Sequence, residues 1–120
     1  MEQFVLMIYQ GTTPLPATPE WEAMPQEEQT RVYADYAAIN QTPGVAPGPP
    51  LGVPADARTV VVKDGGVDVR EGAHLGTDGA VGGFAVLEAE DLAAAIDVAS
   101  RIPAARLGGA IEVRPVAKYW

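Results

Sequence analysis

The chain has 120 residues, enough for one folded unit, so we expect residues 1–120 to form a single domain. A formal net charge of −8 disfavours binding to nucleic-acid phosphates or anionic membranes, and the absence of cysteine excludes disulfides and cysteine-ligated metal centres. The first basic residue is Arg31, so we expect no secretory signal peptide, which would begin with a positively charged region. The apolar runs are far shorter than a membrane span. We therefore expect a cytoplasmic protein with neither a membrane nor a nucleic acid as partner.

The first half of the chain predicts one strand and one helix between proline-rich loops. Phe4–Tyr9 is a run of β-branched and aromatic residues, which is typical of a strand. Residues 25 to about 41 begin with proline and two glutamates and repeat apolar residues at i, i+4 and i+7, which predicts a helix. Nine of the eleven prolines lie at or before Pro54, and their two clusters predict ordered loops or extended edge segments.

The second half predicts a hairpin, a strand, a helix and a last strand. Arg58–Lys63 and Val67–Arg70 flank Asp64-Gly65-Gly66, a sequence that favours a tight hairpin turn. The later elements are a glycine-rich loop over 71–83, a strand over 84–87, a helix over 91–101 and a strand over 110–116. This order predicts an α+β fold, a ferredoxin-like βαββ-βαβ sandwich whose two helices cover one face of the sheet.

The predicted strands are apolar on both faces. Phe4–Tyr9, Val60–Val62 and Phe84–Leu87 do not alternate apolar with polar residues, as a sheet with one wet face would. Because two helices cover only one face, a second copy of the chain is expected to cover the other and form a homodimeric α+β barrel. The alternative is a monomer in which the long proline-rich loop folds over the sheet.

Several short segments carry a family resemblance through their order and spacing. They are Phe4–Tyr9, Trp21 with Met24–Glu28, Gly82–Phe84, Pro103–Arg106 and Ile111–Pro115. Together they resemble the YCII-related proteins over nearly the whole chain, and most closely the branch named for an Asp-Gly-Pro-Phe motif. The resemblance implies one domain with the dimeric α+β barrel fold.

The chain departs from that branch at its name motif. The motif falls on Glu71-Gly72-Ala73-His74, where only the glycine is retained. Other YCII-related branches carry a His–Asp pair with the histidine in the first helical region. The helix predicted here contains no histidine, so that pair cannot be assigned to this chain.

Candidate catalytic residues gather in the glycine-rich loop. His74 is the only histidine, and Glu71 and Asp78 lie near it in the sequence. An imidazole beside carboxylates can act as a general base near neutral pH, so these three residues are the candidate catalytic group. The alternative is an exposed loop histidine without a role. One histidine with flexible acids is a weak metal-binding pattern, so neither a metal nor another cofactor is expected.

Four further residues are candidates for binding a small organic substrate. Arg70 could pair with a carboxylate or enolate, or it could be a solvated hairpin residue. Tyr9 could direct its hydroxyl into a pocket, or pack at the rim of the core. Glu112 and Arg114 share one face of the last predicted strand, which lines either the barrel interior or solvent.

Aromatic residues mark two further places. Trp21, Tyr33 and Tyr36 are expected to pack together around the first helix. Tyr119 and Trp120 form an aromatic tail that would pack on a partner subunit or cap a cavity.

Functions from different classes stay open at this point. One is a cofactor-free acid–base enzyme, of cyclase, isomerase or lyase type, acting on a small molecule in a biosynthetic pathway. Another is a non-catalytic small-molecule-binding or regulatory dimer, since YCII-related proteins are commonly associated with stress-type sigma factors. A third is a stable barrel that docks another protein through its aromatic tail. An enzyme predicts a closed apolar pocket with His74 or Arg70 pointing into it, whereas a binding protein predicts the pocket without that arrangement.

Overall fold

The computed structural model describes residues 1–119, and its central layer is a four-stranded antiparallel sheet. The strand order is β2-β5-β1-β6, with β1 at Glu2–Tyr9, β2 at Val45–Pro47, β5 at Val81–Ala89 and β6 at Ala110–Pro115. A strand–helix–strand unit followed by a second such unit, with this order, is the ferredoxin-like arrangement. The predicted α+β fold class is therefore confirmed.

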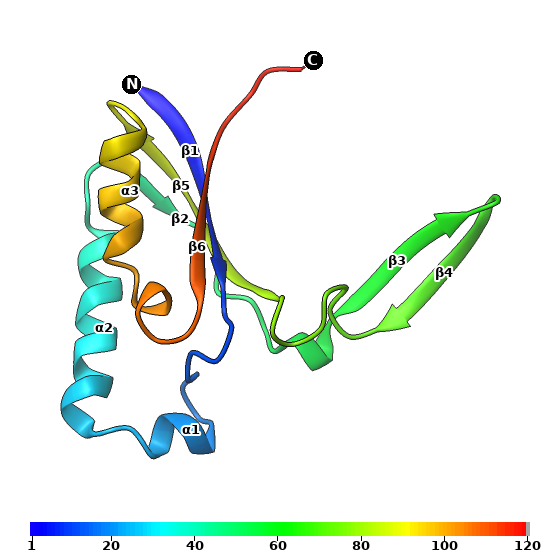
Figure 1. The fold of residues 1–120 in the computed structure, drawn as a ribbon, viewed down its shortest axis with the longest axis horizontal. Helices are drawn as coiled ribbons and strands as arrows, with labels where there is room; N and C mark the ends of the chain where they lie inside the picture. The colour runs from blue at the N-terminus through cyan, green and yellow to red at the C-terminus, as the bar shows by residue number, and fades with distance from the viewer. Residues whose placement is uncertain (120) are drawn as a thin grey trace.

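Two helices pack on the same face of this sheet (Figure 1). They are α2 (Gln26–Asn40) and α3 (Leu92–Ser100), and the short α1 (Pro19–Glu22) precedes α2. The carboxylate of Asp91 caps α3 by accepting a hydrogen bond of 2.8 Å from the Ala94 N–H. Two short 3-10 turns, η1 (Pro54–Asp56) and η2 (Pro103–Ala105), each begin with the proline that suits a first helical position.

The core lies between the helices and the facing side of the sheet. Along β1, Phe4 and Leu6 are buried, and along β5, Leu87 is buried with the two flanking alanines. These residues pack against Ile39 of α2 and against the apolar side of α3. The opposite side of the sheet carries Val5, Met7 and Tyr9 from β1 with Phe84 and Val86 from β5, which we call the open sheet face.

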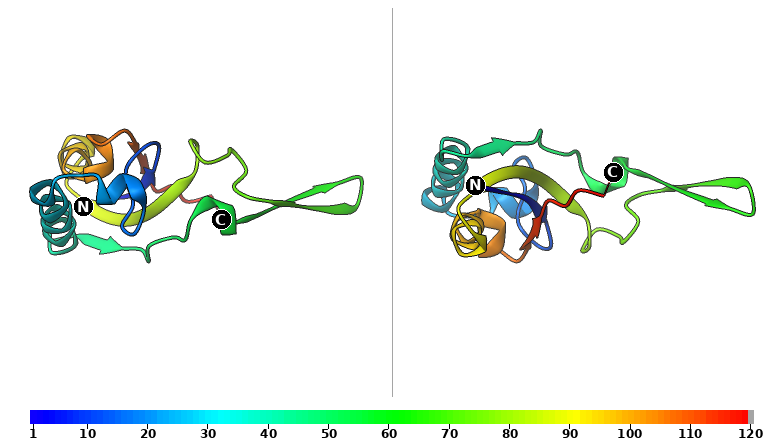
Figure 2. Two further views of the ribbon diagram at one scale, coloured as in Figure 1. Left: turned by 90° about the horizontal axis from the view of Figure 1, so that it is seen from below. Right: turned by 90° about the horizontal axis from the view of Figure 1, so that it is seen from above.

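A separate two-stranded sheet projects from this structure. It consists of β3 (Arg58–Lys63) and β4 (Gly66–Glu71), joined at Asp64 and Gly65, whose positive φ angles of 51° and 76° suit a tight hairpin. Figures 1 and 2 show this hairpin extending away from the rest of the chain. We call residues 58–71 the arm and the remaining described residues the body.

The arm corrects one prediction about the sheet. Val60–Val62 was expected among strands covered on both faces, but these residues lie in the arm and outside the four-stranded sheet. The fourth strand of the body sheet is instead β2. This strand lies in the proline-rich tract, for which a loop or an extended edge segment was predicted. An edge position tolerates Pro47, because the missing N–H is not needed by a second neighbour. Within residues 1–119, no helix has the length and apolar character needed to cross a membrane.

Candidate functional site

The three candidate catalytic residues lie around the base of the arm. Glu71 ends β4, and His74 and Asp78 follow in the turn-rich loop; all three are exposed. Among the described residues, no hydrogen bond or ion pair joins His74 to either carboxylate. Asp78 lines a hollow with residues 10–15, whereas Glu71 and His74 do not. The three residues are therefore close in sequence, but their side chains do not line a common cavity.

The four candidate binding residues lie on two surfaces. Arg70 is on the arm, where its Nε lies 2.8 Å from the Asp68 carboxylate. Glu112 and Arg114 pair opposite Met7 and Val5, respectively, so they belong to the open sheet face, as does Tyr9. The Glu112 Oε2 and Arg114 Nε atoms are 3.9 Å apart, and both side chains are exposed in the single chain.

A cavity of about 350 Å³ lies between α2, the start of β5 and residues 47–51, and we call it the proline-loop pocket. Ile8, Ile39 and Ile102 supply apolar walls, and Phe84 and the proline loop complete them. Two backbone hydrogen bonds hold this loop against β5, from the Gly48 N–H to the Phe84 carbonyl (2.9 Å) and from the Leu51 N–H to the Gly82 carbonyl (3.3 Å). The proline-rich tract thus forms one wall of a pocket.

Two glycines make room for the groups around this pocket. A Cβ atom at Gly48 would lie 2.6 Å from ring atoms of Phe84, and a Cβ at Gly82 would overlap the Gln10 side-chain oxygen. Real Cβ atoms do not approach neighbours this closely, so larger residues would displace the ring or the amide. A larger residue at either position would therefore have to move a neighbouring side chain.

Three polar side chains reach the proline-loop pocket, and none is charged at neutral pH. They are Gln10, Tyr36 and Asn40. Burial raises the pKa of the Tyr36 phenol, which keeps its hydroxyl neutral and able to donate a hydrogen bond. The Gln10 amide already donates to the Thr13 carbonyl at 2.9 Å, which orients its side-chain oxygen. Among the described residues that line the pocket, Tyr36 is the sole ionisable group.

Sequence reasoning did not identify this pocket. Tyr36 was assigned to core packing with Trp21 and Tyr33, and the structure places Trp21 and Tyr33 in an edge-to-face contact at 5.3 Å. Tyr36 is half-buried and also packs against the core, so that assignment describes part of its environment. The available signal was the presence of small residues on both sides of the pocket, Gly48 in the proline-rich tract and Gly82-Gly83 in β5.

Comparison with known protein families identifies the relatives of this fold. A model of the YCII-related domain matches residues 4–119. The chain belongs to the YCII-related domain family. No curated protein matches the sequence. The match confirms the resemblance to YCII-related proteins seen in the sequence motifs, across nearly the whole chain.

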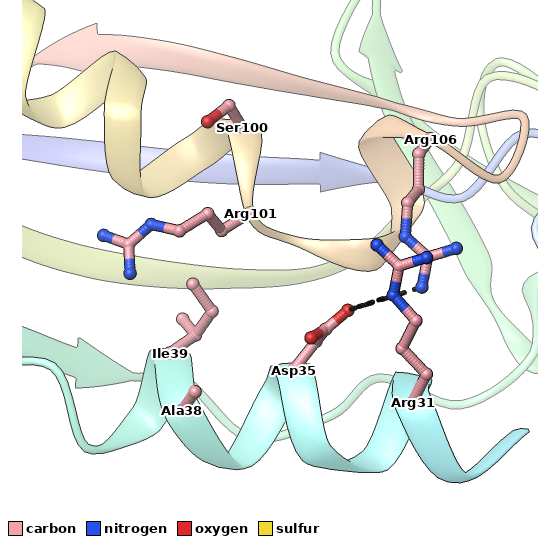
Figure 3. A pocket seen from close by; sticks show the side chains of 7 residues that line it. All are labelled: Arg31, Asp35, Ala38, Ile39, Ser100, Arg101 and Arg106. Carbon is pink, nitrogen blue, oxygen red and sulfur yellow. Dashed lines mark hydrogen bonds and ion pairs between the residues drawn. The ribbon is translucent and has the colours of Figure 1, made fainter. Parts of the chain in front are cut away.

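This YCII-related domain has a third hollow, lined by charged side chains, of about 210 Å³ between α2 and the segment that follows α3 (Figure 3). Figure 3 shows the guanidinium groups of Arg31 and Arg106 side by side next to Asp35, while Arg101 points away from them. Arg106 donates to Asp35 at 3.3 Å and also to Glu28. The hydrogen bond with Glu28 is the main cause that raises the pKa of Arg106, so its guanidinium stays charged.

These charges are largely satisfied within the YCII-related domain. Asp35 lies 3.7 Å from Arg31 as well as near Arg106, and Arg101 pairs with Asp97 at 3.4 Å. The network joins the middle of α2 to residues just after η2, and we therefore interpret it as a contact between elements of the body. Among residues 1–119, no three histidine, aspartate or glutamate side chains are grouped closely enough to hold a metal ion.

Proposed function

We propose that this YCII-related domain binds a small, uncharged, mainly apolar organic molecule in the proline-loop pocket. The observation that supports the proposal is the lining: apolar walls around about 350 Å³, with a phenol and two amides as the polar groups. Ligand pockets in proteins have volumes of roughly 300–1,000 Å³ and combine apolar walls with a few placed polar groups. Because no lining group is charged at neutral pH, a strongly ionised ligand would lose its hydration without gaining a counter-ion.

The polar groups suggest how such a ligand would be oriented. The neutral Tyr36 hydroxyl can donate to a ligand carbonyl, and the amides of Gln10 and Asn40 can donate or accept. Ile39 and Ile102 would contact a flat or branched hydrocarbon portion. We therefore infer that the ligand carries one or two carbonyl or hydroxyl groups on an apolar skeleton.

The position of the glycine-rich loop favours binding over catalysis in a single chain. His74, Glu71 and Asp78 do not line the proline-loop pocket, so it lacks an acid–base pair of its own. A cofactor-free cyclase, isomerase or lyase would need those residues to reach a pocket by another route, such as delivery from a second copy. A binding or regulatory role requires no such delivery. The altered motif Glu71-Gly72-Ala73-His74 fits a branch related to the Asp-Gly-Pro-Phe proteins in which this loop has changed.

We further infer that the working unit is a homodimer. Helices cover one side of the sheet, and the open sheet face carries Val5, Met7, Phe84 and Val86 in a chain too small to leave a whole apolar face in water without cost. Two sheets packed face to face would form the α+β barrel. In that dimer the exposed Glu112–Arg114 pair would lie at or inside the interface.

Fluorescence titration with 2-naphthol, a neutral aromatic alcohol, tests the proposed pocket. We expect saturable binding that weakens about threefold to tenfold in Tyr36→Phe, because a net hydrogen bond contributes roughly 0.5–1.5 kcal/mol. Gly48→Ala should also weaken binding, since the added methyl group displaces the Phe84 ring. Tyr33→Phe is the matched control, because Tyr33 is exposed and does not line the pocket. Unchanged affinity in both pocket variants would contradict the proposal.

A further inference from the structure

The arm carries an apolar face that nothing in the described chain covers. Val60 pairs opposite Val69, and Val62 pairs opposite Val67. Alternate residues of a strand share a face, so all four side chains lie on the same side of the hairpin, which we call the valine face. Their exposed fractions are 61% for Val60, 66% for Val62, 69% for Val67 and 59% for Val69.

An uncovered hairpin of this kind is unusual for a stable chain in water. A two-stranded sheet on its own is marginally stable and needs a third strand or another layer behind it. The other face of the arm carries Thr59, Lys63, Asp68 and Arg70, which suit solvent, and one half-buried apolar residue, Val61. One apolar and one polar face is the pattern of a sheet with one covered side, and exposed apolar patches on small domains mark contact surfaces.

The arm cannot be covered by its own body in this arrangement. All three views in Figures 1 and 2 show it pointing away from the four-stranded sheet. At the base of the arm, the Gly72 N–H donates to the Ala57 carbonyl at 2.9 Å and the Thr59 hydroxyl donates to the Gly72 carbonyl at 2.9 Å, so the two strands stay paired up to the point where they leave the body. The covering surface must therefore come from another molecule.

The distribution of charge favours a second copy of this chain as that molecule. Between residues 58 and 71, three cations (Arg58, Lys63 and Arg70) balance three anions (Asp64, Asp68 and Glu71), so the arm has no net charge. The body consequently carries the full −8. Two copies repel each other least where a neutral arm meets the partner, and the arm is the segment best suited to approach an acidic twin.

The area that a stable interface needs also favours a second copy of the chain as the partner of the arm. A stable interface buries about 800 Å² on each partner, which is more than four valines supply. The open sheet face is a second uncovered apolar surface on this chain, and a two-fold axis repeats every contact, so one pair of copies could bury both surfaces twice. We propose that the valine face is a dimerisation arm that packs on a second copy of the chain; this rests on the homodimer inferred above.

Sedimentation equilibrium of the full chain tests the proposal. The arm variant combines Val60→Thr, Val62→Thr, Val67→Thr and Val69→Thr, because threonine keeps the valine shape and its strand preference while adding a hydroxyl. We expect a wild-type dimer and a dissociation constant at least tenfold higher for the arm variant. The control combines Leu92→Thr and Ile96→Thr, two similarly exposed residues of α3, and should dimerise like the wild type. A wild-type dissociation constant in the arm variant would overturn the proposal.

A single-cysteine experiment keeps the proposal testable if the fourfold variant does not fold. Because the chain contains no cysteine, Val62→Cys and Ile96→Cys each introduce one reporter thiol. We expect iodoacetamide to modify Cys at position 62 more slowly as protein concentration rises, with no such change at position 96. A dimer with a fully reactive thiol at 62 would refute the arm and leave the face-to-face homodimer standing. A monomeric wild type would refute both, while 2-naphthol binding reports on the pocket separately.

Discussion

The body sheet and the arm both contain apolar strand residues, but these are buried in the body and exposed in the arm. Strand β1 contains Phe4 and Leu6, which are 2% and 0% exposed because two helices pack on them. Four of the five valines in the arm form directly opposed pairs, and each of these four is more than half exposed. Both sheets are antiparallel and both satisfy the local requirements of a strand. The comparison shows that an apolar strand indicates that one face needs a cover, without indicating which sheet it joins.

The largest effect expected from this comparison is on the free energy of unfolding. Leu6→Ala removes a fully buried side chain and should cost about 2–5 kcal/mol, because the body cannot close the cavity completely. Val62→Ala in the arm should cost less than about 1 kcal/mol at protein concentrations low enough to separate copies, since the side chain is exposed there. Urea denaturation measures both.

The size of the two losses decides how independent the arm is. Val86→Ala, on the half-buried open sheet face, is the matched control for removing a valine from a strand, and its cost should lie between the other two. A loss for Val62→Ala as large as that for Leu6→Ala would show that the arm packs on its own body. That result would remove the contrast between the two sheets.

The sequence predicted most helices and strands of the body and the arm because their signals are local. Asp91 marks the start of α3, and Asp64-Gly65 marks the hairpin turn through its tolerance of positive φ. Strand membership could not be predicted in the same way. Val60–Val62 and Phe84–Leu87 have similar patterns, but only the latter pairs with β1, and that pairing is set by contacts distant in the sequence.

The candidate site also depends on contacts between residues that are distant in the sequence. Glu71, His74 and Asp78 are neighbours in sequence, and proximity suggested a shared site, yet they line no common cavity in the described chain. Gln10 and Tyr36 are 26 residues apart and line one pocket. They line the same pocket because β1 and α2 pack against each other and the proline-rich tract lies beside β5. A short stretch of sequence does not reveal this packing.

Ionisation of the half-buried Tyr36 phenol should change the stability of the body by less than the loss of a core side chain. Burial raises the pKa of Tyr36 in the folded chain above its value of about 10 in the unfolded chain. The unfolded state therefore releases this proton first, so the stabilising difference is present below pH 10 and is lost as the pH rises further. We expect the urea midpoint to fall between pH 9.5 and about 11 for this reason. Tyr36→Phe should reduce that fall, and exposed Tyr33→Phe should reduce it less; equal slopes in the two variants would contradict the assignment.

The smallest expected effect compares ion pairs in the two regions. Arg106 and Glu28 join segments 78 residues apart in the body, and their side chains are 30% and 28% exposed. Arg70 and Asp68 lie two residues apart on one arm strand, and their side chains are 61% and 53% exposed.

A double-mutant cycle on each pair, with alanine at both positions, measures its coupling energy in urea denaturation. We expect about 0.5–1 kcal/mol for Arg106–Glu28, because that pair holds α2 to the segment after η2 and is partly shielded from water. We expect a coupling near zero for Arg70–Asp68, since an exposed pair on one strand fixes nothing that the strand does not already fix. Added salt should reduce the first coupling and leave the second unchanged. Equal couplings would mean that the arm is as well shielded as the body, even when the copies are apart.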